Sequence, residues 1–264
     1  MLNFNYELID NNQDSTIMLL HGFLSSKESM RDIAAGLSDL RNIILVDLPG
    51  FGGTNSTAQQ YGMKDVAAGL VSVADRHGIK TFDVLGYSMG GRTALALTAE
   101  FTERIGKCIL ESASPGIPGE QKRADRLTVD TERSEFIVND YDKFLAFWQD
   151  MPLFHTQQRL SQPVLDAQRA ERLQQIPKEA ADSLLKYGTG VQPSYWDVLS
   201  SLNNDFYLIT GSVDSKFIAI AESMSEQLKS AKLDIVENCG HNIHLENFEV
   251  YINTVRKYLE EDNS

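Results

Sequence analysis

Short apolar runs alternate with helical segments over most of the chain. The runs consist of three or four residues rich in Val, Ile, Leu and Phe, which is typical of buried strands. This alternation predicts an α/β fold with a doubly wound, mostly parallel sheet. We expect strands at 17–20, 43–46, 82–85, 108–110, 207–210 and 233–236, and helices near 30–40, 64–77, 91–101, 217–229 and 248–260.

The alternation stops between residues 118 and 191. This segment has several amphipathic helical patterns and no strand signal, and it lies between the fourth and fifth expected strands. We therefore expect a helical cap at 118–191, inserted into an α/β-hydrolase core formed by residues 1–117 and 192–264. The cap holds six of the twelve arginines, and this preference for arginine over lysine suggests bidentate binding of carboxylate or phosphate by a few of them.

Composition narrows the class of protein further. With 264 residues and 42% hydrophobic content, the chain can bury one large α/β core. The formal net charge of −13 argues against a nucleic-acid partner, because phosphate binding needs clustered positive charge. We expect a cytoplasmic protein with no membrane partner, because no apolar run of about 18 residues and no signal-peptide pattern occur. Cys108 and Cys239 are too few for a disulfide framework or a cysteine-based zinc site.

A serine lies at the junction of an expected strand and an expected helix. The sequence GYSMG (86–90) follows the apolar run 82–85 and precedes a helix rich in small residues. A Gly-x-Ser-x-Gly string alone is weak evidence, since it also occurs by chance in glycine-rich turns. The strand before it and the helix after it favour a nucleophile elbow that presents Ser88 on a sharp turn.

Two further side chains complete a candidate catalytic triad in the chain order serine, acid, histidine. Asp214 follows the fifth expected strand through a short loop, and His241 follows the sixth through a glycine turn. Taken separately, this aspartate could be an ordinary turn residue and this histidine a bonded polar group. Together they predict that His241 takes the proton of Ser88 while Asp214 orients the imidazole. His244 lacks the preceding glycine turn and is interpreted as local structure.

A second turn predicts an oxyanion hole. The first expected strand ends in the sequence HGFL (21–24), which resembles the oxyanion segment of α/β-hydrolases. The donors implied are the backbone N–H groups of Phe23 and of Met89, which follows the elbow serine. His21 is interpreted as a structural imidazole that braces this loop.

Several strings outside the triad are more specific than the elbow. They span almost the whole chain and comprise GYSMGGR (86–92), LESASPGI (110–117), Arg123 and Arg126, Trp148, PLF (152–154), Gln168 and Arg169, and GTGVQPSYW (188–196). In these strings the chain resembles the 2-succinyl-6-hydroxy-2,4-cyclohexadiene-1-carboxylate synthases of menaquinone biosynthesis, which have the α/β-hydrolase fold.

The resemblance implies a lyase that uses no cofactor and no metal. Its substrate is a small tricarboxylate, 2-succinyl-5-enolpyruvyl-6-hydroxy-3-cyclohexene-1-carboxylate, from which the enzyme eliminates pyruvate. Proton abstraction beside the succinyl ketone builds an enolate, which the amides of Phe23 and Met89 would hold. Ser88 would be the base, either directly or by positioning His241.

The resemblance also implies how the substrate is bound. Arg92, Arg123 and Arg169 match the family's anion-binding positions, while Tyr87 and Trp148 line the pocket. Arg126 is an alternative to Arg123, whereas Arg133 and Arg159 are expected to be solvated.

Two other function classes fit the elbow and the cap. The first is an esterase or carbon–carbon bond hydrolase, since fold does not decide chemistry. The second is a non-catalytic ligand receptor that keeps the pocket. An arginine four residues after the serine, Arg92, favours the lyase because a neutral acyl substrate has no use for it. No oligomeric state is predicted.

Overall fold

A single seven-stranded sheet runs through the protein. The computed structural model describes residues 2–56 and 58–261. The strand order is β1-β3-β2-β4-β5-β6-β7, and every pairing is parallel except that of β1 with β3. The strands are β1 Tyr6–Ile9, β2 Thr16–Leu20, β3 Asn42–Val46, β4 Phe82–Tyr87, β5 Ile105–Glu111, β6 Asp205–Gly211 and β7 Ala231–Val236. This confirms the predicted α/β fold, to which β1 adds an edge strand.

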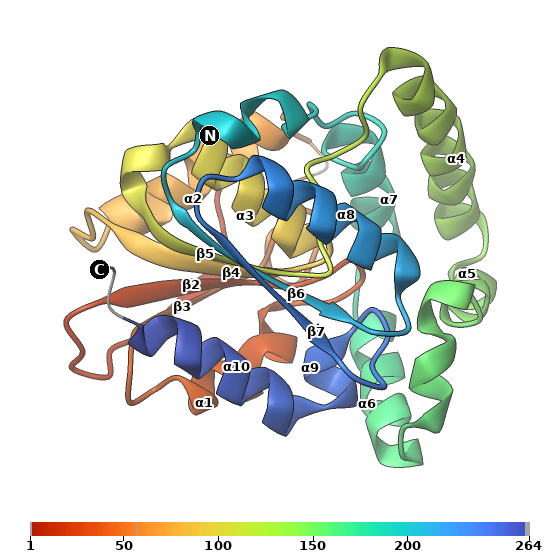
Figure 1. Cartoon of the computed structure of the whole chain (residues 1–264). Coiled ribbons are helices and arrows are strands. Elements are labelled where there is room, and N and C mark those ends of the chain that lie inside the picture. The colour runs from red at the N-terminus through yellow and green to blue at the C-terminus, as the bar shows by residue number, and fades with distance from the viewer. Residues whose placement is uncertain (1, 57, 262–264) are drawn as a thin grey trace.

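Helices cover both faces of the sheet (Figure 1). Successive side chains of a strand point to opposite faces, so Ile17 and Leu19 pack with one set of helices while Met18 and Leu20 pack with the other. On the first face lie α1 (Arg31–Gly36) and α10 (Phe248–Glu260), and on the second lie α2 (Met63–Asp75), α3 (Met89–Glu100) and α8 (Ser215–Gln227). All four of these β2 side chains are fully buried, which explains why residues 17–20 read as an unbroken apolar run.

The segment between β5 and β6 is helical and stands to one side of the sheet (Figure 1). We call residues 118–191 the cap; its limits remain a prediction. The cap comprises α4 (Glu120–Asn139), α5 (Tyr141–Gln149), the 3₁₀ helix η3 (Pro152–Arg159), α6 (Gln162–Leu173) and α7 (Pro177–Lys186). The short helices elsewhere are η1 (Lys27–Met30), η2 (Thr102–Arg104), η4 (Trp196–Ser201) and α9 (Ile243–Glu246).

One edge of the cap is tied to core loops by side-chain acceptors. Glu171 Oε1 accepts hydrogen bonds from the Ser26 amide and hydroxyl, both at 2.9 Å, and from the Ser25 hydroxyl at 3.0 Å. Gln175 Oε1 accepts the Gly52 amide at 3.0 Å. Because Ser25 and Ser26 closely follow the predicted oxyanion segment, this seam fixes α6 against that loop.

Asp47 joins three segments at the end of β3. Its carboxylate accepts the amides of Lys27 at 2.7 Å and Gly53 at 2.9 Å, and the Asn5 side-chain amide at 2.6 Å. The residue is 1% exposed. These bonds give Asp47 a structural role, since it holds η1 and the loop after β3 together.

Within the part of the chain that the structure describes, no helix has the length and apolarity needed to cross a membrane.

Candidate active site

The predicted elbow has the backbone geometry of a strained turn. β4 ends at Tyr87, α3 begins at Met89, and Ser88 between them has φ 50° and ψ −103°. Such a conformation costs a residue with a side chain about 1–3 kcal/mol. A Cβ on Gly86 would lie 2.3 Å from the Gly90 carbonyl oxygen, and one on Gly90 would lie 2.1 Å from that of Leu20. The turn therefore needs both glycines to lift Ser88 out of the sheet.

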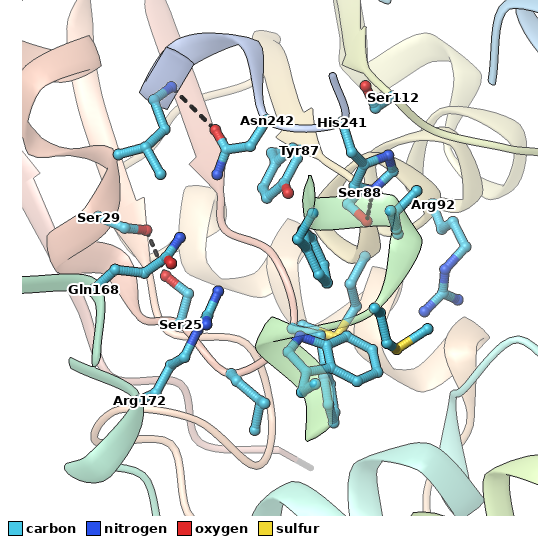
Figure 2. Close-up of a pocket in the computed structure, with 18 of the residues that line it drawn as sticks. Ser25, Ser29, Tyr87, Ser88, Arg92, Ser112, Gln168, Arg172, His241 and Asn242 are labelled. Atoms are coloured by element: carbon cyan, nitrogen blue, oxygen red, sulfur yellow. Dashed lines mark hydrogen bonds between the residues drawn. The ribbon is translucent and has the colours of Figure 1, made fainter. Parts of the chain in front are cut away.

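The three side chains of the predicted triad lie in direct contact. Nε2 of His241 is 2.9 Å from Oγ of Ser88 (Figure 2). Nδ1 of His241 is 2.7 Å from Oδ2 of Asp214. The imidazole is 1% exposed. With Nδ1–H donated to the carboxylate, Nε2 is free to accept the serine proton, which is the arrangement needed to activate a hydroxyl.

The predicted oxyanion donors line the same cavity as Ser88. Met89 is the first residue of α3, so its N–H has no partner within the helix. Phe23 follows β2 on the turn after His21 and Gly22, and both Phe23 and Met89 border the cavity. The Nδ1–H of His21 donates to the Gly22 carbonyl at 2.7 Å, and its Nε2 accepts the Leu48 amide at 3.0 Å. Complete burial lowers the pKa of His21 to about 4, as suits a neutral bracing group.

The cavity has a volume of about 1100 Å³ and lies between the elbow and the cap. Its aromatic wall includes Tyr87 and Trp148, the two residues predicted to line it. Trp148 packs on Phe23 with a ring-centre separation of 5.1 Å, and Tyr87 packs on His241 at 5.6 Å. Burial, followed by the nearby Glu111 carboxylate, raises the pKa of Tyr87 well above its usual range, so its hydroxyl stays a donor.

One side of the cavity is strongly cationic. Arg92 donates to the Gln192 side chain and borders the cavity near Ser88 (Figure 2). Burial, with the nearby Arg126 guanidinium acting in the same direction, lowers the pKa of Arg92 to about 10. Arg126 and Arg133 also border the cavity, 2.8 and 3.9 Å from the fully buried Asp130 carboxylate. A substrate carboxylate would relieve the repulsion among these cations.

A further arginine has a buried and unpaired guanidinium. Arg172 is 7% exposed and borders the cavity on the side of Ser25, Ser29 and Gln168, across from Arg92 (Figure 2). Its side chain makes no hydrogen bond or ion pair to residues 2–56 or 58–261, and it lies 6.0 Å from the centre of the Phe154 ring. Burial lowers the pKa of Arg172. A buried charge without a partner is costly, so this position calls for an anionic ligand.

Three of the cap arginines lie elsewhere than the sequence predicted. Arg123 donates to the Ile117 carbonyl at 3.2 Å and lies outside the cavity lining, and Arg169 is exposed and also lies outside it. The cavity lining instead includes Arg126 and Arg172, which lie three residues later on the same helices, so the structure does not bring Arg123 and Arg169 into the cavity. Arg133, expected to be solvated, has a side chain only 19% exposed and stacks over Trp148 at 5.6 Å. Arg159 has a 58% exposed side chain.

Two cavity residues were missed as site candidates. Lys216, two residues after Asp214, borders the cavity, and burial followed by repulsion from Arg126 lowers its pKa. His244 also borders the cavity and pairs with Glu111, although the sequence suggested only local structure. Its position only three residues after His241, in the short helix α9, was the available signal.

Comparisons with known proteins place the chain among α/β-hydrolases. The alpha/beta hydrolase fold family matches residues 15–248. A Bacillus subtilis (strain 168) protein, provisionally named 2-succinyl-6-hydroxy-2,4-cyclohexadiene-1-carboxylate synthase, is 32% identical over 94% of this chain and 91% of its own length. The synthase of that name from Salmonella typhimurium (strain LT2) is 28% identical over 88% of each chain. The solved structure of MenH from S. aureus has a TM-score of 0.94 and 29% identity over 100% of both chains.

Esterases share the fold at lower identity. An esterase from Thermogutta terrifontis superimposes with a TM-score of 0.84 and 21% identity, covering 98% of this chain and 93% of that one. This similarity concerns the fold alone. Among the described residues, no group of three or more His, Cys, Asp or Glu side chains could hold a metal ion.

Proposed function

The chain belongs to the alpha/beta hydrolase fold family and, within it, to the 2-succinyl-6-hydroxy-2,4-cyclohexadiene-1-carboxylate synthases, and we propose that the Ser88 site performs their elimination of pyruvate. The protein is thus an enzyme of menaquinone biosynthesis that acts on a small molecule. The observation that carries the site assignment is the meeting of a hydrogen-bonded Ser–His–Asp trio and an unpaired buried arginine in one cavity.

Proton abstraction is the first step of the proposed mechanism. Carbon 2 of the substrate lies next to the succinyl ketone, so removing its proton yields an enolate. Ser88 takes this proton while its own passes to His241, and Asp214 stabilises the resulting imidazolium. The amides of Phe23 and Met89 hold the enolate oxygen, whose charge develops in the transition state.

Loss of the enolpyruvyl group completes the elimination. The electron pair of the enolate forms a double bond between carbons 2 and 3, the double bond between carbons 3 and 4 moves to carbons 4 and 5, and the bond from carbon 5 to the ether oxygen breaks, so that its electron pair leaves with the oxygen. The product then has the 2,4-diene that its name describes. The whole sequence is a 1,4-elimination across the ring.

Three carboxylates require cationic partners, and the cavity offers them on two sides. Arg92, Arg126 and Arg133 form one side, and Arg172 with the Tyr87 hydroxyl forms the other. Bidentate arginine contacts hold carboxylates in defined orientations, which a proton transfer at carbon 2 requires. This replaces the contacts that sequence resemblance assigned to Arg123 and Arg169.

An esterase or carbon–carbon bond hydrolase is the main alternative function. The triad and oxyanion donors would serve it equally well. The arginines on two sides of the cavity favour the lyase, because a neutral acyl chain gains nothing from buried cations. A non-catalytic receptor would keep the cavity but turn over no substrate. The cytoplasmic location of the protein stays a prediction from the sequence.

The deciding experiment is to supply the enolpyruvyl tricarboxylate to the protein and measure pyruvate release. The lyase releases pyruvate, and Ser88→Ala abolishes the release. Hydrolysis of a neutral ester without pyruvate release would instead identify an esterase. Binding without any turnover would identify a receptor.

A further inference from the structure

A second histidine–carboxylate pair opens into the same cavity as the triad. Nδ1 of His244 lies 2.7 Å from Oε2 of Glu111, the last residue of β5. Oε1 of Glu111 accepts the amides of Ile243 at 2.7 Å and His244 at 3.1 Å. Glu111 is 0% exposed, so its carboxylate is a buried, fully engaged acceptor.

This pairing fixes which ring nitrogen of His244 can act in the cavity. Nδ1–H donates to Glu111, so any second proton on the ring is carried by Nε2. Nε2 makes no hydrogen bond to a described residue and is not among the enclosed polar atoms, and the ring borders the cavity. The buried Glu111 carboxylate is the counterion of the imidazolium that such a proton creates.

The neighbours of His244 keep it apart from the triad. The Tyr87 ring contacts both imidazoles, with ring-centre separations of 5.6 Å to His241 and 5.0 Å to His244. The His244 ring also packs against the Tyr251 ring, with a ring-centre separation of 5.7 Å. Two imidazoles separated by one aromatic ring can therefore reach different atoms of a single substrate.

The reaction needs a second proton-transfer group at such a distance. Carbons 2 and 5 lie opposite each other in the six-membered ring, and the triad is occupied at carbon 2. The ether oxygen on carbon 5 leaves with an electron pair, and a donor near it would stabilise the developing charge.

We propose that His244 is a catalytic residue that protonates the departing enolpyruvyl oxygen, with Glu111 as its positioning residue. The inference rests on the proposed function. As the bond from carbon 5 to oxygen breaks, its electron pair goes to the oxygen, which takes the proton from Nε2 of His244. Enolpyruvate leaves and converts to pyruvate in water, while His244 regains a proton from solvent.

The test separates proton removal at carbon 2 from departure at carbon 5. His244→Asn keeps an amide N–H where Nδ1 stands, so Glu111 remains bonded, but it removes Nε2. The reaction is run in D₂O, and pyruvate release is compared with deuterium incorporation at carbon 2 of recovered substrate. For His244→Asn, we expect pyruvate release to fall about 10²-fold or more, while exchange at carbon 2 continues.

Continued exchange also shows that the variant is folded and that its triad works. Ser88→Ala should lose both exchange and release. His77→Gln is the matched control, because His77 is exposed and its Nε2 lies 3.0 Å from the Tyr6 hydroxyl; it should change neither. An analogue with 4-nitrophenoxide as leaving group needs no protonation, so His244→Asn should turn it over at nearly the wild-type rate.

Two results would overturn the role of His244. Unchanged pyruvate release in His244→Asn would show that Nε2 donates no proton, and equal losses of exchange and release would show that His244 is only structural. Failure of the wild-type protein to release pyruvate at all would instead refute the proposed function.

Discussion

At the scale of single residues, Ser88 sets local strain against chemistry. Its φ of 50° and ψ of −103° suit glycine far better than serine. The unfolding free energy of Ser88→Gly should therefore exceed that of Ser88→Ala by about 1 kcal/mol. Both variants should lose activity. Chemical denaturation of the two variants measures the difference. Equal stabilities would show that the elbow stores no strain at this residue.

The contacts of His241 predict that the triad acts as one unit. Ser88→Ala, His241→Ala and the double variant should each lower kcat by a similar factor, roughly 10³ or more, because their effects are not additive. Asp214→Asn should lower kcat by disturbing the imidazole tautomer while substrate binding persists. Steady-state pyruvate release measures these losses. If the double variant lost the product of the two single factors, the residues would be acting independently.

Arginine pairs on two cap helices provide matched tests of substrate binding. Arg172→Ala and Arg126→Ala should each lower kcat/KM for the tricarboxylate, by a factor that corresponds to about 2 to 4 kcal/mol of lost transition-state stabilisation. The reason is that a substrate carboxylate loses its bidentate partner in a partly dry cavity. Arg169→Ala and Arg123→Ala, three residues earlier on the same helices, should change it little. Kinetics with the tricarboxylate make the comparison.

A neutral ester serves as the control substrate for these variants. Its hydrolysis, if any occurs, should be insensitive to all four substitutions, since it presents no carboxylate. Larger losses in Arg169→Ala than in Arg172→Ala would reject the cavity as the anion site. The sequence could not tell which of these four arginines face the cavity, because all four lie on amphipathic cap helices. Only the packed structure shows which of them border it.

At the scale of elements, the seam between α6 and the oxyanion loop depends on Glu171. Burial raises the pKa of Glu171 in spite of the bonds from Ser26 and Ser25. Removing the side chain in Glu171→Ala leaves the buried Ser26 amide without its acceptor, which should cost about 1–3 kcal/mol of unfolding free energy. Glu171→Gln keeps an acceptor and should be milder.

The same raised pKa predicts how stability changes with pH. A carboxyl whose folded pKa is raised favours the folded state most below its unfolded pKa of 4.5, and this contribution is lost as the pH rises through the folded pKa. The unfolding free energy of the wild type relative to Glu171→Gln should therefore decrease as the pH rises from about 4.5. Urea unfolding across this range measures it, and a difference that grows with pH would contradict the assignment.

The sequence predicted elements best where burial was complete. β2 and β3 contain unbroken apolar runs because helices cover both faces of the sheet there, whereas β7 carries Lys232 and Asp234 and is only partly buried. β1 was missed because all four of its residues are only partly buried, so the short YELI sequence has neither a continuous nor an alternating apolar pattern. The helices of the core appeared within a few residues of their predicted ends.

At the scale of the whole molecule, the sequence predicted only part of the charge distribution. The net charge of −13 and the arginines of the cap are visible in the sequence, but which arginines border the cavity is not. Packing brings Arg92 from α3 and Arg126 and Arg133 from α4 to one cavity wall. The contact among Ser88, Asp214 and His241 was predictable because chain order and strand ends specify it, whereas the arginines of the cavity wall depend on how the cap and the core meet.

The global stability of the fold should depend on pH through Asp47. Burial alone would raise its pKa, but the bonds from the Gly53 and Lys27 amides outweigh this effect and hold the pKa below 3.8. A carboxyl with a lowered folded pKa stabilises the protein above the unfolded pKa, and this contribution is lost as the pH falls through the folded pKa.

Asp47→Asn removes the titrating group and leaves the amides of Lys27 and Gly53 with a poorer acceptor, so it should cost about 2–3 kcal/mol of unfolding free energy at neutral pH. In urea unfolding the gap between wild type and Asp47→Asn should stay constant above about pH 5 and shrink toward pH 3; a gap that persists at pH 3 would show that the Asp47 carboxylate does not stabilise the fold by its charge.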